Sequence, residues 1–556
     1  MPNAFSILKK VLKKKGNNKQ QQQKEDNPKK KQADKHARKD SQHLKKRLQF
    51  IQERLGESND VVVREFASSN NKVQFALLYI DGLTDKKLIH DHIIRPIQSD
   101  NVVSIYADRL TTNNALTLIK EHISSTSELT EVINLTQALK MVLSGDTALM
   151  IDGIETILVF GSRMWQGRTV GEPETEAAVR GPREGFTETL RVNTSLLRRR
   201  IRSENLRLET MKAGRRTGTD IVLAYIRDIV NLRTLEELRV RIAAIDTDSI
   251  LESGYIEELI EDVPFSVFPQ IEHTERVDKA AAAILDGRIV VMVENTPFVL
   301  MLPTTFFQFI QASEDYYERP YIGMALRFLR LLVLNIALML PAIYVAIVTF
   351  HQEMLPTPLL LSIAAAREGI PFPAAAEALL MEGMFEVLRE AGVRLPKTVG
   401  QAVSIVGGLV IGDAAIRAGL VSPAMVIVVA ATAISTFAIP AFNASITLRL
   451  LRFPLIILGA VMGLYGVIFG LLMILIHLSG LQSFGVPYLS PLVHGTADDM
   501  VKTFARPFWW MTGERPRQLA LQDTKRQAGN MRPQKAPLDE RELTHEQTED
   551  NDAGKR

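Results

Sequence analysis

The sequence predicts an α+β cytosolic region of two related α/β lobes, followed by a polytopic α-helical membrane domain. At 556 residues the chain exceeds one compact core, because domains average roughly 150 residues. Nearly all long uncharged runs lie after Leu331, and before it the Asp-Gly turn signal at 152–153, flanked by apolar runs, recurs at 286–287. These three observations indicate an internally repeated soluble half and a membrane half.

Residues 1–59 are predicted to form a disordered basic tail rich in Lys and Gln. They include Lys13–Lys15, Lys29–Lys31 and the glutamine run Gln20–Gln23, with few apolar residues. Such a composition buries too little surface to offset the entropy lost on ordering. Attraction to anionic membrane lipid, contact with RNA and simple solubilisation all stay open as roles, and we expect no specific nucleic-acid partner.

The composition also excludes several kinds of chemistry. The chain has no cysteine, so disulfides, cysteine zinc sites and thiol nucleophiles are absent, and no signal-peptide pattern opens the sequence. No GxxxxGK(S/T), HExxH or GxSxG motif occurs. The cluster His90, Asp91 and His92 is more typical of a polar helix surface than of a metal site. We therefore expect a cytosolic soluble half, no enzymatic activity, no cofactor and no metal.

Residues 60–170 and 219–320 are each predicted to form one α/β lobe. Both show an opening strand, two helices and a hairpin around Asp-Gly. In the first lobe these features lie at Val73–Ile80, Thr84–Ile94, Leu129–Leu143 and Ala148–Phe160. In the second they lie at Ile221–Ile226, in helices beginning near Leu235 and Ser249, and at Ala282–Val293. The shared order of elements indicates a duplication.

Residues 171–218 are predicted to form an Arg-rich helical linker between the lobes. Its first part, Gly171–Gly185, is rich in Gly, Pro and charge, and Thr187–Met211 reads as a helical stretch with three consecutive arginines at 198–200. An Arg-rich helix is typical of a solvated surface. A lever or subunit contact beside the membrane is the functional alternative.

Residues 321–480 are predicted to form the membrane domain, because about 20 apolar residues span a bilayer core of roughly 30 Å. The predicted spans are 331–350, 399–416, 423–448 and 454–478. Between the first two, the stretch 357–391 contains Arg367, Glu368, Pro371 and Pro373. We therefore expect a broken or re-entrant element there, covered by protein or water. Residues 481–556 are predicted to form a polar C-terminal tail.

The positive-inside rule gives conflicting topologies for this domain, because neither four nor five spans place all of its basic segments on the same side of the membrane. Four spans place the basic tail on the side of the lobes but put five cations on the other side, Arg389, Arg394, Lys397, Arg449 and Arg452. With a fifth span through 359–385, these five cations lie on the side of the lobes, but the basic C-terminal tail lies on the opposite side. We favour four spans and a re-entrant element.

Small residues recur four apart in three pairs, Gly408 and Gly412, Gly459 and Gly463, Gly466 and Gly470. Such faces let helices approach closely in lipid, so these glycines are predicted to serve helix packing or oligomerisation. Asp413 lies inside an uncharged run, with Arg417 one turn later. A structural salt bridge and a place on an ion path are both open for Asp413.

Three carboxylates, Glu382, Glu386 and Glu390, are spaced to form one stripe on a helix, with Glu377 off the stripe. In an oligomer such a stripe would form rings that concentrate cations. An exposed amphipathic helix at the interface is the alternative. The candidate ion path is therefore Glu377, Glu382, Glu386 and Asp413. Coupling of the lobes to the membrane is assigned to Tyr316, Tyr317, Arg319, Arg327 and Arg330.

Many ordered stretches between Phe75 and Pro491 give the sequence a family resemblance. In the soluble half they are Gly185–Glu188, Asn193–Arg200, Asp286–Arg288, Thr296–Phe298, Pro303–Phe306 and Glu314–Arg319. In the membrane half they are Arg367–Gly369, Pro371–Pro373, Glu377–Glu382, Arg389–Gly392, Ile405–Gly412 and Phe484–Tyr488. The chain resembles the A subunits of GerA-type spore germinant receptors.

The resemblance implies a multi-pass subunit of the spore inner membrane with its N-terminal lobes on the core side. It implies two partners, a transporter-like B subunit that binds nutrient and a C-subunit lipoprotein, and a homo-oligomer that forms a nutrient-gated cation channel. At position 413 many members of the family are expected to have an uncharged or amide residue, whereas this chain has Asp413. The resemblance therefore implies no pore role for Asp413. A nutrient-independent paralogue and a secondary transporter are the alternatives.

Overall fold

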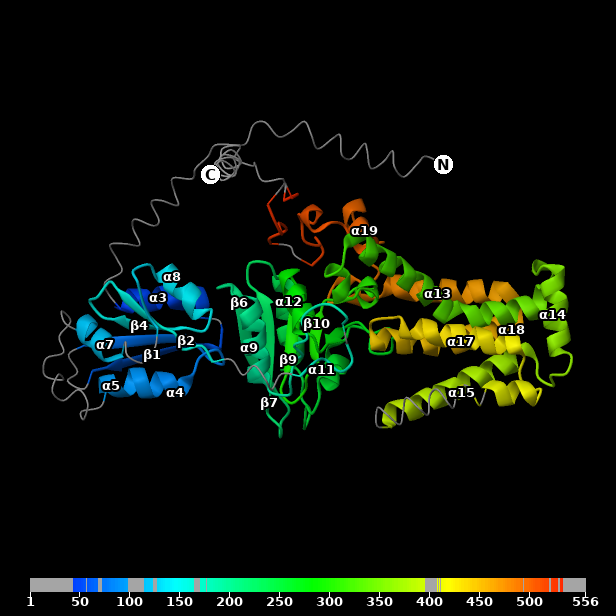
Figure 1. The fold of residues 1–556 in the computed structure, drawn as a ribbon, viewed down its shortest axis with the longest axis horizontal. Helices are drawn as coiled ribbons and strands as arrows, with labels where there is room; N and C mark the ends of the chain where they lie inside the picture. Colours follow the sequence, from blue (N-terminus) through cyan, green and yellow to red (C-terminus); the bar gives the residue numbers. More distant parts are fainter. Residues whose placement is uncertain are drawn as a thin grey trace, which may run out of the picture. The chain divides into compact units, whose positions relative to one another are not determined.

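The computed structural model describes residues 44–533 apart from 57, 69–72, 99–114, 124–127, 165–170, 177, 396–407, 409, 411, 494, 520–521 and 529–530. The chain divides into two compact units, residues 1–165 with 202–204 and residues 166–201 with 205–556. The first unit is one α/β lobe. The second contains another lobe, a helical half and a C-terminal segment (Figure 1).

The first lobe is a five-stranded antiparallel sheet with helices on both faces (Figure 1). Its strand order is β1-β2-β4-β5-β3, with β1 Val61–Ala67, β2 Gln74–Ile80, β3 Leu129–Val132, β4 Thr147–Ile151 and β5 Ile157–Phe160. One face packs against α3 Leu44–Leu55 and α8 Leu135–Val142. The other packs against η1 Ile89–Ile94, α5 Arg95–Gln98 and α7 Ala115–Ile123, and the short α4 Lys86–Leu88 leads into η1 without a buried residue of its own.

The second lobe repeats this topology. Its strand order is β6-β7-β9-β10-β8, with β6 Leu206–Ala213, β7 Thr219–Ile226, β8 Glu272–Thr274, β9 Ile289–Val293 and β10 Val299–Leu302. Helices α9 Leu190–Arg200 and α12 Val277–Leu285 cover one face, and α10 Leu232–Ala243 and α11 Ser253–Ile260 cover the other. Asp85 and Asn231, each five residues after the end of β2 or β7, both cap the next helix. The two lobes therefore share one sheet topology and one helix-capping position.

Several predicted elements need correction, each for a local reason. Leu129–Leu143 is not one helix, because its first four residues form the edge strand β3 and Asn134 caps the helix that follows. The hairpin predicted at Ala282–Val293 is wrong, because Ala282–Leu285 ends α12 and Gly287, at φ 96°, begins the turn into β9. The hairpin at Ala148–Phe160 is present as β4 and β5.

Two predicted boundaries also move. Residues 44–55 of the predicted tail form α3, whose apolar side chains Leu44, Ile51 and Leu55 are buried against the first sheet; residues 1–43 lie outside the described residues. The second lobe begins before residue 219, because α9 and β6 lie within the predicted linker and pack on or pair with its sheet. The residues of β6 form a strand and not the predicted helix; the sequence pattern indicates helix there because they follow directly on an arginine-rich helical stretch.

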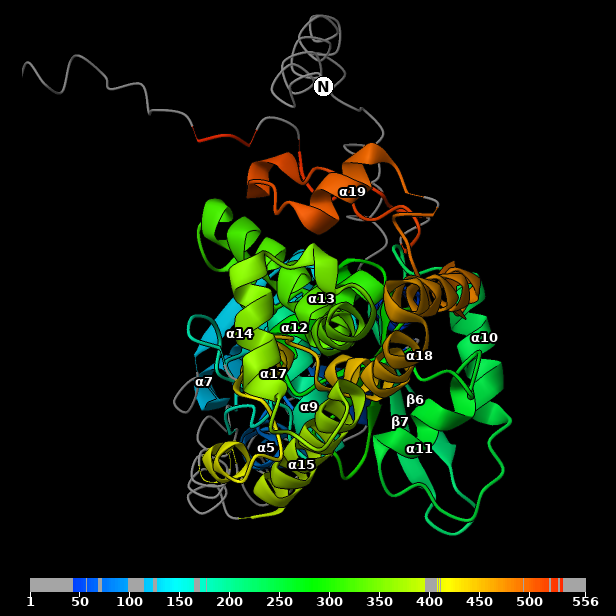
Figure 2. The same ribbon diagram turned by 90° about the vertical axis from the view of Figure 1, so that its right-hand side faces the viewer.

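The helical half consists of α13 Pro320–Phe350, α14 Thr357–Arg367, α15 Ala374–Arg394, α17 Pro423–Phe437 and α18 Phe442–Gly480 (Figures 1 and 2). Within the described residues, α13 and α18 are long and apolar enough to cross a membrane. The predicted span 331–350 lies within α13. The predicted broken element 357–391 contains two helices separated by residues 368–373.

Helix α18 is two antiparallel arms, because the backbone reverses at Gly463. This residue has non-helical dihedrals, φ 65° and ψ −145°. A Cβ on Gly470 would lie 2.5 Å from Leu455 Cδ2, so the two arms are in contact. At the open end, Thr447 of the first arm donates to Val267 O and His477 of the second arm contacts Ser266. Each arm, at about 1.5 Å per residue, is roughly 25–31 Å long.

The remaining predicted spans have different ends. The span 423–448 is interrupted, because α17 ends at Phe437 and α18 begins at Phe442, with Pro440 between them. The span 454–478 contains the Gly463 reversal and so covers parts of both arms. Much of the span 399–416 lies outside the described residues. The C-terminal segment returns to the second lobe through β11 Gln482–Ser483, β12 Val486–Pro487, α19 Ala497–Phe504 and η6 Trp509–Met511.

Candidate functional site: a paired acidic helix and a charged junction

Glu382 of α15 forms a buried ion pair with Arg452 of α18. Their side chains are each 1% exposed, and Arg452 Nη1 lies 2.5 Å from a Glu382 carboxylate oxygen. The same guanidinium donates to Ala337 O of α13 at 2.8 Å and to Thr436 Oγ1 of α17 at 3.1 Å. Arg452 therefore joins four helices, and removing either partner leaves a buried charge, which typically costs 3–5 kcal/mol.

The other predicted carboxylates of α15 are paired as well. Glu386 accepts from Arg449 at 2.6 Å, one turn towards the open end of α18. Glu377 is buried, lies 3.1 Å from Arg367 of α14 and accepts from the backbone N–H and hydroxyl of Ser422, each at 3.0 Å. Successive carboxylates on α15 thus meet arginines from different elements, which fixes α15 against α14, α17 and α18.

Two other acidic groups make only local pairs. Glu390 pairs with Arg394 on the exposed side of α15, and Asp413 pairs with Arg417 at 2.9 Å. The Asp413 side chain is 56% exposed, so this ion pair contributes little to stability. Glu377, Glu382 and Glu386 lie along α15, whereas the ion pair found for Asp413 in the described residues is the local one with Arg417.

The six predicted packing glycines fall into three settings. Gly459, Gly466 and Gly470 lie at contacts too close for a side chain; a Cβ on Gly459 would be 2.8 Å from Ala342 O of α13. Gly463 forms the reversal of α18. A Cβ would meet nothing closer than 3.7 Å at Gly408 or Gly412 in this chain.

The junction between the second lobe and α13 centres on Asp315, which the sequence-based assignment omitted. Its side chain is fully buried in the 3-10 turn η4 Ser313–Tyr316 and lies 2.6 Å from Arg330 and 3.2 Å from Arg327. Arg327 also donates to Lys502 O and Thr503 O at the end of α19. The junction therefore has three parts: lobe, α13 and C-terminal segment.

The tyrosines assigned to coupling extend this junction. The Tyr316 ring lies 5.1 Å from the Arg327 guanidinium carbon, and Arg506 donates to Tyr316 O at 2.7 Å. The Tyr317 hydroxyl donates to Asp278 of α12, and burial together with this bond raises the pKa of Tyr317. Arg319 precedes α13, and no hydrogen bond of its side chain is found in the described part of the chain. The tandem Glu314-Asp315 before two tyrosines was the signal that could have identified Asp315.

The motif Asp286-Gly287-Arg288 has a structural explanation in the second lobe. Buried Arg288 donates to Glu272 at 2.7 Å and to the carbonyl oxygens of Pro303 and Met301. It therefore fixes the end of β10, from which the chain continues to the junction. Nearby, Glu272 and Glu176 raise the pKa of buried Lys279 despite desolvation, and Lys279 and Arg288 lower that of Glu272.

Nothing in the described residues suggests a metal centre, since no group of three His, Asp or Glu side chains could hold an ion there. His90 and His92 are exposed on η1, next to the buried Ile89 and Ile93.

Comparisons with known proteins agree with the resemblance. The model of the GerA family, described as Bacillus/Clostridium GerA spore germination protein, matches residues 49–518. Spore germination protein KA of Bacillus subtilis is 45% identical over 92% of this chain and 93% of its own length. The uncharacterized membrane protein YfkQ of the same organism is 44% identical over 87% of this chain and 92% of its own.

A solved structure, the N-terminal domain of the A subunit of the Bacillus megaterium spore germinant receptor GerK3, is 37% identical in sequence. It covers 48% of this chain and 96% of its own, with a TM-score of 0.39. Because the family model covers most of the sequence and the curated relatives span nearly its whole length, this chain belongs to the GerA family of spore germination proteins and is not an enzyme.

Proposed function

We propose that this chain is a multi-pass subunit of a nutrient-germinant receptor of the spore inner membrane. In this proposal it works with a transporter-like B subunit and a C-subunit lipoprotein, and it oligomerises into a nutrient-gated cation channel. Its family membership supports the role in germination. The apolar helices α13 and α18 support a membrane location.

The observation that carries the channel proposal is the pair of arginine-held carboxylates on α15. Glu382 and Glu386 lie among apolar helices, where charged groups are costly and mark ion pathways or relays. Arg452 and Arg449 each neutralise one of these carboxylates through a single oxygen, and the second oxygen of each carboxylate is buried without a hydrogen-bond partner. We infer that this arrangement is the closed state, and that opening separates α15 from α18 and exposes the carboxylates to the path.

The same contacts suggest how a signal reaches the gate. Asp315 connects the second lobe to α13 through Arg327 and Arg330. Further along α13, Ala337 O accepts from Arg452, the residue that holds Glu382. A shift of α13 relative to the lobe would therefore act directly on the Arg452–Glu382 pair. Such coupling requires only that α13 has two discrete packing arrangements and that nutrient binding favours one of them.

The test is potassium efflux from a non-sporulating bacterium that produces this chain with its B and C partners. Candidate amino acids and sugars are added to wild type, Glu382→Gln, Asp413→Asn and Glu390→Gln, with membrane assembly verified for each. We expect Glu382→Gln to give efflux before nutrient is added, because neutral Gln holds Arg452 less tightly. Glu390→Gln, on the exposed side of the same helix, should match wild type.

Other outcomes would change the proposal. Wild-type efflux without nutrient or partners would favour a nutrient-independent paralogue. If the assembled complex gives no efflux with any nutrient, the channel function is rejected. Identical traces for Glu382→Gln and Glu390→Gln would exclude the Glu382–Arg452 pair from gating.

A further inference from the structure

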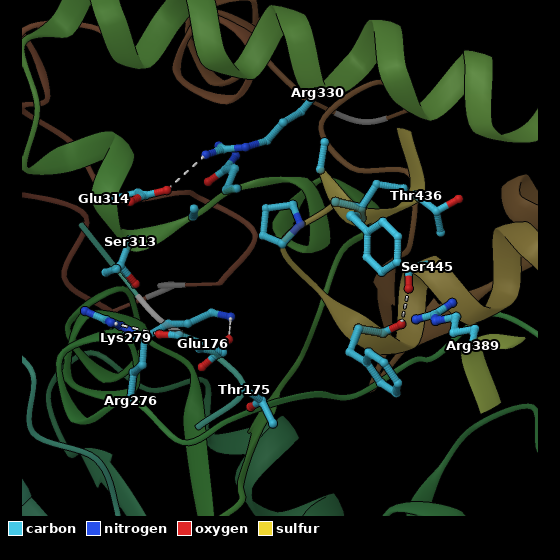
Figure 3. Close-up of a pocket in the computed structure, with 18 residues that line it drawn as sticks. Thr175, Glu176, Arg276, Lys279, Ser313, Glu314, Arg330, Arg389, Thr436 and Ser445 are labelled. Carbon is cyan, nitrogen blue, oxygen red and sulfur yellow. Dashed lines mark hydrogen bonds and ion pairs between the residues drawn. The ribbon is translucent and has the colours of Figure 1, made fainter. Parts of the chain in front are cut away.

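A cavity of about 380 Å³ lies between the second lobe and the helical half (Figure 3). The lobe contributes Arg276, Lys279 and Glu176, and the helices contribute Arg330, Arg389 and the turn between α17 and α18. The lining contains four cationic and two acidic side chains, Glu176 and Glu314. Lining residues alone therefore do not decide the charge of an occupant, because three of the four cations also have carboxylate partners just behind the wall, Asp278, Glu272 and Asp315.

Most of these charges are already engaged. Arg276 pairs with Asp278, Lys279 with Glu176 and Glu272, and Arg330 with Asp315. Glu176 also accepts from Thr274, and Glu314 lies 3.8 Å from Arg330. These groups form the walls of the cavity, and Figure 3 shows Lys279 and Glu176 grouped on the side opposite Arg389.

Arg389 differs from every other arginine described between residues 320 and 480. The other seven each form an ion pair: Arg327, Arg330, Arg367, Arg394, Arg417, Arg449 and Arg452. No ion pair of Arg389 is found among the described residues, and its neighbours Glu386 and Glu390 pair with Arg449 and Arg394. Its guanidinium is the one left to bind a group from outside the chain.

The surroundings of Arg389 indicate which anion this is. Its guanidinium carbon lies 5.6 Å from the ring of Phe437 and 5.5 Å from that of Phe442. These rings are 67% and 53% exposed, at the last residue of α17 and the first of α18. Aromatic and arginine side chains at the ends of apolar helices are typical of the membrane–water interface, where lipid phosphates lie. A guanidinium binds phosphate oxygens through paired N–H donors.

We propose that this cavity binds the phosphate of a phospholipid headgroup, with Arg389 as its principal ligand and the acyl chains leaving over Phe437 and Phe442. The proposal rests on the membrane location proposed above, but it does not depend on channel activity. A lipid bound here would bridge the lobe to α15, the helix that carries Glu382.

The test compares phospholipid retained by the purified full-length chain, measured by native mass spectrometry from detergent, in wild type, Arg389→Gln, Arg389→Lys and Arg394→Gln. We expect Arg389→Gln to retain roughly tenfold less phospholipid, because a charge-assisted phosphate contact is lost. Arg389→Lys should keep part of it. Arg394→Gln, an exposed and paired arginine five residues away, should match wild type. Equal retention in Arg389→Gln and Arg394→Gln would overturn the proposal.

A second arm separates lipid from free phosphate. Thermal unfolding of delipidated protein is followed with added phosphatidylglycerol in nanodiscs or with inorganic phosphate alone. Stabilisation by the lipid that Arg389→Gln abolishes supports the proposal. Stabilisation of wild type by inorganic phosphate and not by the lipid would assign the cavity to a soluble anion and reject the lipid headgroup. Neither arm measures ion flux, so failure of the channel proposal leaves both results interpretable.

Discussion

At the scale of single residues, buried acidic groups of the second lobe make its stability depend on pH. Burial raises the pKa of Glu257 on α11 to about 8, with the carboxylates of Glu261 and Glu252 adding to the effect. The nearest cation-forming group, His273, is 4.0 Å away, and burial lowers its pKa. Glu257 is therefore protonated in the folded lobe at neutral pH.

The sign of the dependence follows from linkage. Below the unfolded pKa of about 4.5 Glu257 is protonated in both states, and as pH rises to about 8 only the unfolded state loses the proton, so stability falls. We expect Glu257→Gln to match wild type at pH 5 and to unfold about 3 °C or more higher at pH 9. Thermal unfolding of the full chain in detergent measures this. The exposed neighbour variant Glu258→Gln should show no such divergence, and a constant difference across pH would contradict the assignment.

At the scale of elements, the reversal of α18 decides how many apolar arms face the membrane. Gly463 adopts φ 65°, a conformation that residues with a Cβ rarely adopt. A Cβ there would meet Phe350 and His351, and the next residue, Leu464, donates its N–H to His351. The hairpin brings Leu455 next to Gly470, fifteen positions later. A continuous helix would hold those positions roughly 22 Å apart.

Cysteine cross-linking tests the hairpin, because the chain has no cysteine of its own. In Leu455→Cys with Gly470→Cys, the nearer of the two leucines that would clash with the new Cβ is removed. The other clash, at 2.9 Å, is with the flexible end of Leu458, so the pair should oxidise in detergent. Thiol counting with a maleimide mass tag before and after oxidation gives the yield. The control pair Leu455→Cys with Gly480→Cys should stay reduced. Equal oxidation of the two pairs, or none in either, would mean that the arms do not form this hairpin.

At the scale of the whole molecule, two of the five cations that conflict with the positive-inside rule lie at the lobe end of the helical half. Arg389 contacts Phe437 and Phe442 near the lobe end, and Arg449 lies towards the same end of α18. The C-terminal segment contacts the lobe and α13 through Arg515 and Arg327. Arg389, Arg449 and the C-terminal segment all lie at the lobe end, so we expect an even number of crossings between the lobe and that segment.

Labelling from one side of the membrane tests this topology. Single cysteines replace three exposed residues, Val179 on the lobe side, Met354 beyond α13 and Met531 in the C-terminal segment. With a membrane-impermeant maleimide, right-side-out and inside-out vesicles should label positions 179 and 531 together and position 354 from the opposite side. Labelling of 531 with 354 would require an odd number of crossings.

The sequence by itself determined the features that depend on residues close together in the chain, namely secondary structure and ion pairs within one helix. Apolar periodicity located β2 and β7, the uncharged run located α13, and helical spacing paired Asp413 with Arg417. Only the tertiary structure decided that Arg452 meets Glu382, seventy residues away, that Asp315 lies between two arginines of α13, and that α18 reverses at Gly463. Local sequence patterns specify backbone dihedral angles and which face of a helix or strand is apolar. Which distant charge offsets a buried one is set by packing, where the desolvation of each group must be compensated by a partner.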